Sequence, residues 1–382
     1  MRMSFPLEKA GRPTRALIDL AALRHNHEQI VRAAGRGREV MAVVKADAYG
    51  HGAVPVAKEL SGAGVGLFAV AMIEEARSLR DAGLGEPILI LGQTYPGQER
   101  ELLTRKLTPV LFDFDLLERL ENTARNLQVE VPVHVKLDTG MGRVGFSAGQ
   151  LPRLLERLRS SKHLLVEGVM SHMPVADELS NSFNQRQCHL FGQSLTSFRQ
   201  AGISPRYIHI GNSAALFSLD LPEVNLVRPG ISLYGGLPGP EFAGRLDLKP
   251  VMRLESAIVA LKEVPAGTGI SYGHRFVTSR SSRVATIPVG YADGFNRLFT
   301  NKGEVLLHGR RVPVVGTVCM DWIMLDVTDL PEASVGDMVT LLGRDGDEQI
   351  TAEEWGEKLD TINYEVFCRI GSRVPRFYPD SL

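Results

Sequence analysis

Between residue 40 and about residue 235 the chain repeats one pattern, in which a short apolar run is followed by a polar turn and an amphipathic stretch. Several of the eight runs are continuously apolar rather than alternating, which is typical of parallel strands covered by helices. Stretches of helical spacing, such as Ile73–Ala82 and Leu151–Ser160, lie between them. The runs are Val40–Val44, Gly66–Ala71, Pro87–Leu91, Thr108–Phe112, Val131–Leu137, Leu164–Ser171, Tyr207–Ile210 and Asn225–Val227.

Eight βα units in series predict a closed (β/α)8 barrel of the TIM type. An open, doubly wound sheet would give much the same pattern, and the count of eight favours the barrel.

The pattern changes near Gly235–Leu246, a segment rich in glycine and proline. The β-type runs that follow, with one helical stretch at Ala352–Leu359, predict a mostly-β domain. We therefore expect a barrel over residues 1–240 and a mostly-β C-terminal domain over residues 241–382. An early strand at about residues 13–20 could join the C-terminal domain instead. The later runs are Arg253–Val264, Ser282–Val289, Gly303–Leu307, Val312–Cys319, Trp322–Val327 and Asp337–Leu342.

Composition and charge are those of an ordinary globular enzyme. The 382 residues are 44% hydrophobic and 23% charged, with a net charge of -1, so nothing suggests a nucleic acid or an acidic membrane as a partner. The most apolar run, Gly64–Ile73, is too short to cross a bilayer, and the first fourteen residues lack the apolar core of a signal peptide. The three cysteines are too far apart in the sequence for a zinc site or a disulfide framework. We expect a cytoplasmic protein with reduced thiols and no bound metal.

Lys45 ends the first apolar run of the barrel pattern and precedes a glycine-rich turn, in the string Met41-Ala-Val-Val-Lys-Ala-Asp-Ala-Tyr-Gly-His-Gly52. Residues at the C-terminal ends of barrel strands face the active site. A lysine placed there is partly desolvated, which favours the neutral amine that imine chemistry needs. Taken alone, Lys45 would more simply be a surface residue just past a strand.

The whole string resembles the cofactor-attachment signature of the alanine racemase family, and the resemblance continues in order through both predicted domains. It implies a pyridoxal-phosphate (PLP) enzyme, an isomerase that interconverts L-alanine and D-alanine and supplies D-alanine for peptidoglycan. In that family Lys45 would hold PLP as a Schiff base, and Tyr49 would hydrogen-bond the cofactor phosphate. The resemblance also implies a homodimer in which the second catalytic base comes from the neighbouring subunit.

Two loops carry residue types suited to the cofactor phosphate. They are His209–Ala215 and Arg228–Gly235, which follow the last two predicted strands, where backbone N–H groups collect in such barrels. The Asn-Ser-Ala-Ala string would also be a normal helix cap, and the two roles are compatible. The resemblance implies phosphate contacts from Ser213, Gly230, Ile231 and Tyr364.

The resemblance places Arg228 against the pyridine nitrogen of PLP, with His172 supporting the arginine. A guanidinium only donates hydrogen bonds, so the nitrogen should stay unprotonated. This weakens the ring as an electron sink and should suppress side reactions such as transamination, for which a carboxylate occupies that position. Alone, a histidine at a strand end would more often have a structural role.

Racemisation is most simply achieved with two bases on opposite faces of the substrate α-carbon. Lys45 is one, and Tyr272, in the string Gly269–Arg275, resembles the catalytic tyrosine of the family. The family pattern implies that Lys45 serves the D-enantiomer and Tyr272 the L-enantiomer. An unperturbed tyrosine has a pKa of about 10, so Tyr272 needs activation by nearby cations or hydrogen bonds. A lone Tyr-Gly in a loop would usually be a packing residue.

Arg143 matches the family arginine that binds the substrate carboxylate, a task that suits a planar fork of donors. Lys136 matches a lysine that is carbamylated in many members and then holds the arginine in place, and a plain ion pair with Asp138 is the alternative. In the C-terminal domain the resemblance implies that Cys319, Met320 and Asp321 line the substrate pocket, with the Met320 amide near the carboxylate. It places Tyr291 at the site entrance.

Three alternatives follow from the residues. PLP decarboxylases for basic amino acids share this architecture, but they place a carboxylate at the pyridine nitrogen, and Arg228 and Tyr272 argue against them. A non-catalytic PLP-binding protein, the alternative of another class, would resemble the barrel half alone. A serine or broad-specificity racemase is hardest to separate, because one methylene or hydroxyl in a pocket is worth only about 1–3 kcal/mol.

Overall fold

The computed structural model describes residues 11–379. The expectation about a signal peptide concerns residues 1–14, of which residues 1–10 lie outside the described range. The chain forms two compact units. The barrel unit contains Leu23–Ala48 and Gly52–Leu248, and the C-terminal unit contains Lys249 onward, Tyr49–His51 and the described residues up to Ala22.

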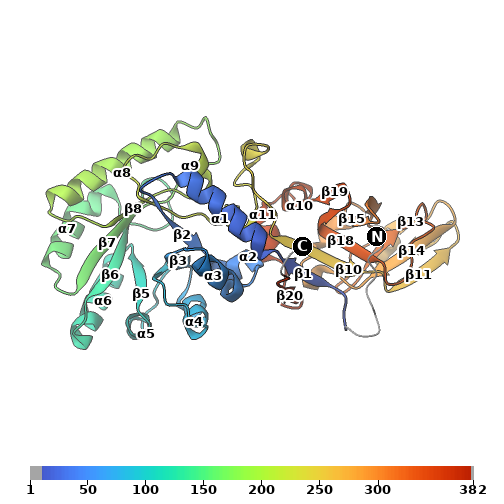
Figure 1. The fold of residues 1–382 in the computed structure, drawn as a ribbon, viewed down its shortest axis with the longest axis horizontal. Helices are drawn as coiled ribbons and strands as arrows, with labels where there is room; N and C mark the ends of the chain where they lie inside the picture. The colour runs from blue at the N-terminus through green and yellow to red at the C-terminus, as the bar shows by residue number, and fades with distance from the viewer. Residues whose placement is uncertain (1–10, 380–382) are drawn as a thin grey trace. The chain divides into compact units, whose positions relative to one another are not determined.

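Eight parallel strands form the sheet of the barrel unit, in the order β8-β7-β6-β5-β4-β3-β2-β9 (Figure 1). The segments of the two end strands, β8 and β9, are joined by two backbone hydrogen bonds. The Asn225 N–H donates to the Ile208 oxygen and the Arg228 N–H donates to the Gly211 oxygen, each at 3.1 Å. All eight predicted strands are present, so the predicted TIM-like barrel is confirmed. They are β2 (Glu39–Val43), β3 (Leu67–Val70), β4 (Ile88–Ile90), β5 (Leu107–Leu111), β6 (Val131–Lys136), β7 (Leu164–Met170), β8 (Tyr207–His209) and β9 (Leu226–Val227).

Helices lie on the outer side of these strands (Figure 1). The predicted helical stretches correspond to α4 and α7, and α7 buries Leu151, Leu154 and Leu158 while its arginines stay more exposed. A leucine every three or four residues thus covers the sheet with one apolar stripe. The helices are α1 (Leu20–Ala34), α2 (Lys45–Gly50), α3 (Ala53–Gly62), α4 (Ile73–Asp81), α5 (Glu99–Thr104), α6 (Phe114–Leu127), α7 (Leu151–Ser160), α8 (Phe183–Gln200) and α9 (Ser213–Ser218).

The C-terminal unit is mostly β, as predicted. Its largest sheet has the order β16-β15-β18-β10-β1-β20, with β19 paired to β18, and smaller sheets are formed by β11-β14-β17 and β12-β13. The early strand β1 (Arg15–Ile18) pairs with β10 and β20 in the largest sheet. The other elements are β10 (Met252–Ala257), β11 (Ala260–Val264), β12 (Gly269–Ile270), β13 (Phe276–Val277), β14 (Ser282–Ile287), β15 (Glu304–Leu307), β16 (Arg310–Pro313), β17 (Ile323–Asp326), β18 (Met338–Asp345), β19 (Glu348–Ile350), β20 (Arg376–Phe377), α10 (Ala352–Leu359) and α11 (Asn363–Cys368).

Two predicted strands of this unit are wrong in extent. The run Arg253–Val264 is divided into β10 and β11, which pair in different sheets. The run Val312–Cys319 stops at Pro313, because the chain turns at Gly316, where φ is 78°. Within residues 11–379, no helix has both the length and the apolar character that a bilayer crossing requires.

Candidate active site

Lys45 follows β2 and begins α2, a single turn whose backbone is left-handed. The next four residues, Ala46–Tyr49, all have φ between 52° and 54°. Each such residue costs roughly 1–2 kcal/mol when it is not glycine, so contacts around the turn must hold it. One of them is the Asp47 carboxylate, which accepts the Ala53 N–H at 2.7 Å. The glycine-rich turn expected after Lys45 is therefore a strained turn built mainly from other residues.

The end of this turn belongs to the C-terminal unit, where Tyr49 is buried beside α11. The Tyr49 and Tyr364 ring centroids are 6.0 Å apart. Burial, and then the neighbouring Tyr364 and Cys368, raise the pKa of Tyr49, so its phenol keeps its proton and can donate. At Gly50, where φ is 79°, an added Cβ would lie 2.4 Å from the Phe367 carbonyl oxygen. Only glycine allows this close approach.

Five of the predicted site residues share the C-terminal ends of the barrel strands. Lys45 follows β2, Lys136 ends β6, Arg143 lies in the loop after it, His172 follows β7 and Arg228 follows β9. Burial, and then Arg143 and Arg228, lower the pKa of Lys136 to about 8, with a smaller contribution from Lys45. Burial and the same cations lower the pKa of His172 to about 3. The four basic side chains are thus close enough to interact, and they create a region that favours anions.

Arg228 is buried, with 5% of its surface exposed, and it is held by neutral groups. Its Nη1 lies 2.8 Å from His209 Nδ1, and its Nη2 donates to the Ser171 oxygen at 2.8 Å and the Ile210 oxygen at 3.3 Å. His172 Nδ1 is 3.4 Å from the same Nη2, so His172 does contact the arginine. Burial lowers the pKa of Arg228 to about 10, which leaves it cationic at neutral pH. Within residues 11–379, no carboxylate pairs with it.

The sequence reasoning missed His209, which is the shorter histidine contact of the arginine. In the sequence His209 is only the first residue of the predicted phosphate loop, and its place at the end of the seventh predicted strand is the one signal of its role.

The two predicted phosphate loops meet at Ser213. Asn212 caps α9, and the Ser213 hydroxyl accepts the Gly230 N–H at 3.0 Å and the Ser232 N–H at 3.5 Å. Ile231 begins the short 3-10 segment that follows Gly230. The buried Ser232 hydroxyl has no hydrogen-bond partner among the described residues. Ser232 is not among the predicted phosphate contacts, although it lies in the loop Arg228–Gly235.

The loop that carries Arg143 is closed by Asp138, whose carboxylate accepts the Gly140 and Gly142 N–H groups at 3.0 and 3.1 Å. Lys136 and Asp138 form no close ion pair among the described residues, although the Asp138 charge opposes the lowering of the Lys136 pKa. At Gly145, φ is 137° and an added Cβ would lie 2.6 Å from the Asp138 nitrogen. The loop therefore depends on a close backbone contact.

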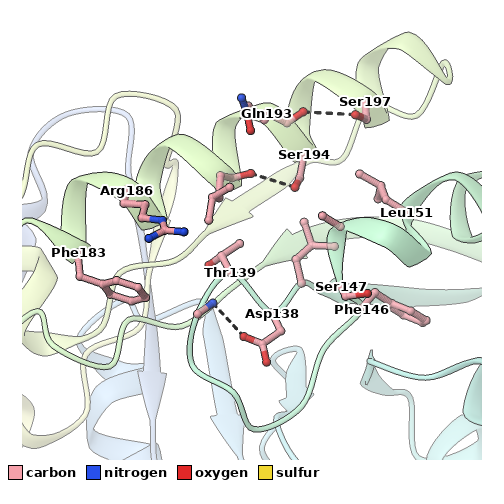
Figure 2. Close-up of a pocket in the computed structure, with 14 residues that line it drawn as sticks. Asp138, Thr139, Phe146, Ser147, Leu151, Phe183, Arg186, Gln193, Ser194 and Ser197 are labelled. Atoms are coloured by element: carbon pink, nitrogen blue, oxygen red, sulfur yellow. Dashed lines mark hydrogen bonds between the residues drawn. The ribbon is translucent and has the colours of Figure 1, made fainter.

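A pocket of about 490 Å³ lies between this loop and α8. Figure 2 shows Asp138, Thr139 and Phe146 on the loop side and Arg186 and Ser194 on the helix side. None of the predicted site residues lines it.

Tyr272 stands on a strained turn of the C-terminal unit and is 72% exposed. The preceding residue, Ser271, has φ 64° and ψ -172°, a region nearly restricted to glycine that costs about 1–3 kcal/mol. The Ser271 hydroxyl donates to the Thr317 oxygen and the Thr317 hydroxyl donates to the Tyr272 oxygen, each at 2.7 Å. Ser271 Oγ also lies 3.4 Å from Cys319 Sγ. Strain of this kind is typical of functional positions.

The remaining predicted residues gather near this turn in the C-terminal unit. The Tyr291 N–H donates to the Cys319 oxygen at 3.0 Å, and Met320 follows with 52% of its surface exposed. Asp321 forms an ion pair with Arg373, whose Nη2 lies 2.7 Å from Asp321 Oδ1. The predicted site residues thus fall into two groups, one in each unit.

Known proteins resemble the chain over nearly its whole length. Residues 18–238 match the family described as alanine racemase, N-terminal domain, and residues 251–378 match alanine racemase, C-terminal domain. A protein named alanine racemase from Geobacter sulfurreducens is 50% identical over 372 residues, covering 96% of this chain and 97% of the relative.

Two crystal structures of alanine racemases are also similar to the chain over nearly its whole length. Alanine racemase from the D-cycloserine producer Streptomyces lavendulae is 35% identical with a TM-score of 0.92, covering 98% of this chain and 99% of that chain. Alanine racemase from Bacillus anthracis, with bound L-Ala-P, is 36% identical with a TM-score of 0.91, covering 97% of this chain and 96% of that one.

Proposed function

The chain belongs to the alanine racemase family of isomerases, and from that premise we propose that it interconverts L-alanine and D-alanine with pyridoxal phosphate as its cofactor. The role that follows is the supply of D-alanine for peptidoglycan. The observation that carries the proposal is the convergence of Lys45, Lys136, Arg143 and Arg228 at the C-terminal ends of the barrel strands. A substrate carboxylate and a cofactor phosphate are the anions such a group would bind.

The residues present fit a phosphorylated cofactor. The buried Ser232 hydroxyl lacks a partner among the described residues, and it lies beside the Ser213 hydroxyl and the Gly230 backbone. A buried polar group without a partner is costly, and a phosphate oxygen would satisfy it. Ser213, Gly230 and Ile231 would hold the phosphate, with the protonated phenol of Tyr49 as a further donor.

Tyr364 would complete the phosphate contacts from α11, and Lys45 would hold the cofactor covalently. When bound, pyridoxal phosphate withdraws electrons from the α-carbon of an attached amino acid and so acidifies its α-proton. Arg228 would face the pyridine nitrogen. Because it is buried, cationic and donor-only, it would leave that nitrogen unprotonated, with His172 and His209 holding the guanidinium in position.

Two proton-transfer groups would act on opposite faces of the substrate. The Lys45 amine, released from the cofactor when the substrate binds, would take the α-proton from D-alanine, and the Tyr272 side-chain oxygen would take it from L-alanine. In each direction the other group returns a proton to the opposite face. Arg143 would hold the substrate carboxylate, with the Met320 amide nearby, and Cys319, Asp321 and Tyr291 would shape the surrounding wall.

We also propose that the enzyme is a homodimer in which Tyr272 and Met320 serve the barrel of the neighbouring subunit. The exposure of large side chains supports this arrangement, since Tyr272, Met320 and Trp322 have 72%, 52% and 45% of their surfaces exposed. Neighbouring exposed aromatic and methionine side chains are typical of protein interfaces.

The activity is tested with the purified enzyme and PLP. We expect D-alanine to form from L-alanine, and chiral chromatography measures its formation. L-serine, L-lysine and L-arginine are measured in parallel. Equal turnover of serine would favour the broad-specificity alternative. No racemisation of any of the four amino acids would contradict the proposal, and PLP binding without turnover would favour a non-catalytic PLP-binding protein.

A separate prediction concerns Lys136, which we expect to be carbamylated. Its pKa of about 8 leaves a substantial neutral fraction near that pH, and the neutral amine adds carbon dioxide to give a carbamate and a proton. Arg143 and Arg228, which disfavour the ammonium form, would stabilise the resulting anion. The carbamate should therefore increase as the pH rises through about 8.

The measurement is ¹³C NMR of the enzyme equilibrated with ¹³C-labelled bicarbonate. A carbamate signal should be present in the wild-type enzyme and absent from Lys136→Met. Absence of the signal from the wild-type enzyme above pH 8 would show that Lys136 stays unmodified.

A further inference from the structure

A row of polar side chains runs through the barrel interior from Arg228 to Glu167. His209 Nδ1 lies 2.8 Å from Arg228 Nη1, and His209 Nε2 lies 2.7 Å from His134 Nδ1. His134 Nε2 is 3.7 Å from Glu167 Oε2, which is beyond a direct hydrogen bond but close enough for the carboxylate charge to act on the N–H group. Both histidines are buried, whereas the Glu167 side chain is 28% exposed. We call these four residues the relay.

The backbone beside the relay has a β-bulge at Glu167 and a glycine that leaves room for the His134 ring. Where β6 pairs with β7, Val133 lies opposite Val166 but His134 lies opposite Gly168, so Glu167 is an extra residue in a β-bulge. Bulges redirect a side chain, and they are rare between parallel strands. An added Cβ at Gly168 would lie 2.5 Å from His134 Nδ1, so the glycine makes room for the imidazole.

The contact with the donor-only Arg228 requires one particular tautomer of each histidine. Because a guanidinium cannot accept, His209 Nδ1 must be the acceptor, and the proton of the neutral ring is on Nε2. That N–H donates to His134 Nδ1, so the His134 proton is on Nε2 and faces the Glu167 carboxylate. Burial lowers the pKa of both histidines, and the neighbouring His134 lowers that of Glu167, so each group stays in the form that this arrangement requires.

We propose that Glu167, acting through His134 and His209, is a positioning residue for Arg228. Its carboxylate keeps the relay in one tautomer, in which His209 always presents a lone pair to the guanidinium. In the opposite tautomer, His209 Nδ1–H would face the Arg228 N–H groups, and the arginine would lose this contact. The inference rests on the proposed function, in which Arg228 faces the cofactor ring.

Other groups near the exposed end of the relay do not fix the tautomers of its histidines. Arg206 interacts with Glu167 and also lies 3.7 Å from the exposed Glu39, and the Tyr207 ring lies 5.7 Å from His134. Within residues 11–379 none of these groups hydrogen-bonds to a relay nitrogen, so Glu167 is the carboxylate that His134 faces. Glu39 provides a matched control, because it is an acidic residue in the same region.

The direct test is ¹⁵N NMR of histidine-labelled protein, recorded with and without PLP. For both His134 and His209 we expect a protonated Nε2 and an unprotonated Nδ1 in the wild-type enzyme, assigned by comparison with His134→Phe and His209→Phe. In Glu167→Leu each ring should show a mixture of tautomers, whereas Glu39→Leu should keep the wild-type pattern. A proton on His209 Nδ1 in the wild-type enzyme would overturn the proposal.

The kinetic readout separates positioning from substrate binding. Glu167→Leu should lower kcat by about tenfold, a size typical of residues that orient a functional group. KM for alanine should stay unchanged, because Arg143 binds the carboxylate. Gly168→Ala, which keeps every relay group but displaces the His134 ring, should have the same effect. Wild-type kcat in both variants would overturn the inference, as would a kcat loss in Glu39→Leu equal to that in Glu167→Leu.

These outcomes are distinguishable from failure of the proposed function. If the wild-type enzyme racemises no amino acid, the proposed function fails, and the tautomers can still be measured in the protein without PLP. If the wild-type enzyme is active but Glu167→Leu keeps single tautomers, only the role of Glu167 is rejected.

Discussion

Replacing Lys45 with alanine should remove both the covalent attachment of pyridoxal phosphate and the turnover of alanine. A positioned base contributes roughly 10²–10⁴-fold to a proton transfer, and Lys45 is proposed to provide attachment as well, so we expect a loss of about 10⁴-fold or more. The phosphate cradle around Ser213 does not involve Lys45, so the variant should still bind the cofactor non-covalently.

The variant is checked by the absorbance band of the lysine–cofactor imine and by chiral chromatography of alanine. The imine band and the racemisation of alanine should both disappear in Lys45→Ala. The matched control Lys58→Ala, which changes an exposed lysine of α3, should keep both. An imine band that survives in Lys45→Ala would assign the attachment to another lysine.

Replacing Tyr272 with phenylalanine should keep the imine band and reduce racemisation by roughly 10²–10⁴-fold, the contribution of one positioned base. L-alanine and D-alanine have equal free energies, so the fall in kcat/KM must be the same in both directions. The asymmetry should appear in deuterium exchange instead. In D2O, D-alanine should still exchange its α-proton through Lys45, whereas exchange of L-alanine should be lost.

Proton NMR of each enantiomer in D2O measures this exchange directly. If L-alanine and D-alanine exchange equally in Tyr272→Phe, Tyr272 is not the base for one face. The change should be local, because the hydrogen bonds that hold this turn involve the Tyr272 backbone oxygen and the side chains of Ser271 and Thr317.

Mixing the two variants tests whether the sites are shared. If Tyr272 serves the neighbouring barrel, a dimer of one Lys45→Ala subunit and one Tyr272→Phe subunit has one site with both defects and one intact site. Activity should therefore return on mixing after subunit exchange. If each subunit used its own Tyr272, both sites of the mixed dimer would be defective and no activity would return.

The sequence was sufficient for the barrel because several of the eight runs are continuously apolar, as expected for strands covered on both faces. All eight runs became strands, and the leucine spacing of α7 showed which face of that helix packs on the sheet. The short strands β12, β13 and β20 have two residues each, too few to show any period, and sequence reasoning missed them. Motifs with several residues at fixed spacing also identified the family, because they lie close together along the chain.

Contacts between distant strands were decided only by the tertiary structure. His134 and His209 are 75 residues apart, and their contact depends on strand register, on the bulge at Glu167 and on the space beside Gly168. No local pattern encodes such an arrangement. The lowered pKa of Lys136 likewise depends on its burial in the barrel and then on Arg143 and Arg228, which the fold brings near it.

The turn after Lys45 shows the same division. The sequence placed Lys45 at the end of a strand, and the family resemblance implied that it holds the cofactor. Its left-handed backbone opposes the intrinsic preference of Ala46–Tyr49, so local propensity could not have predicted it. Contacts formed in the folded protein offset that strain, and the Asp47–Ala53 hydrogen bond is one of them.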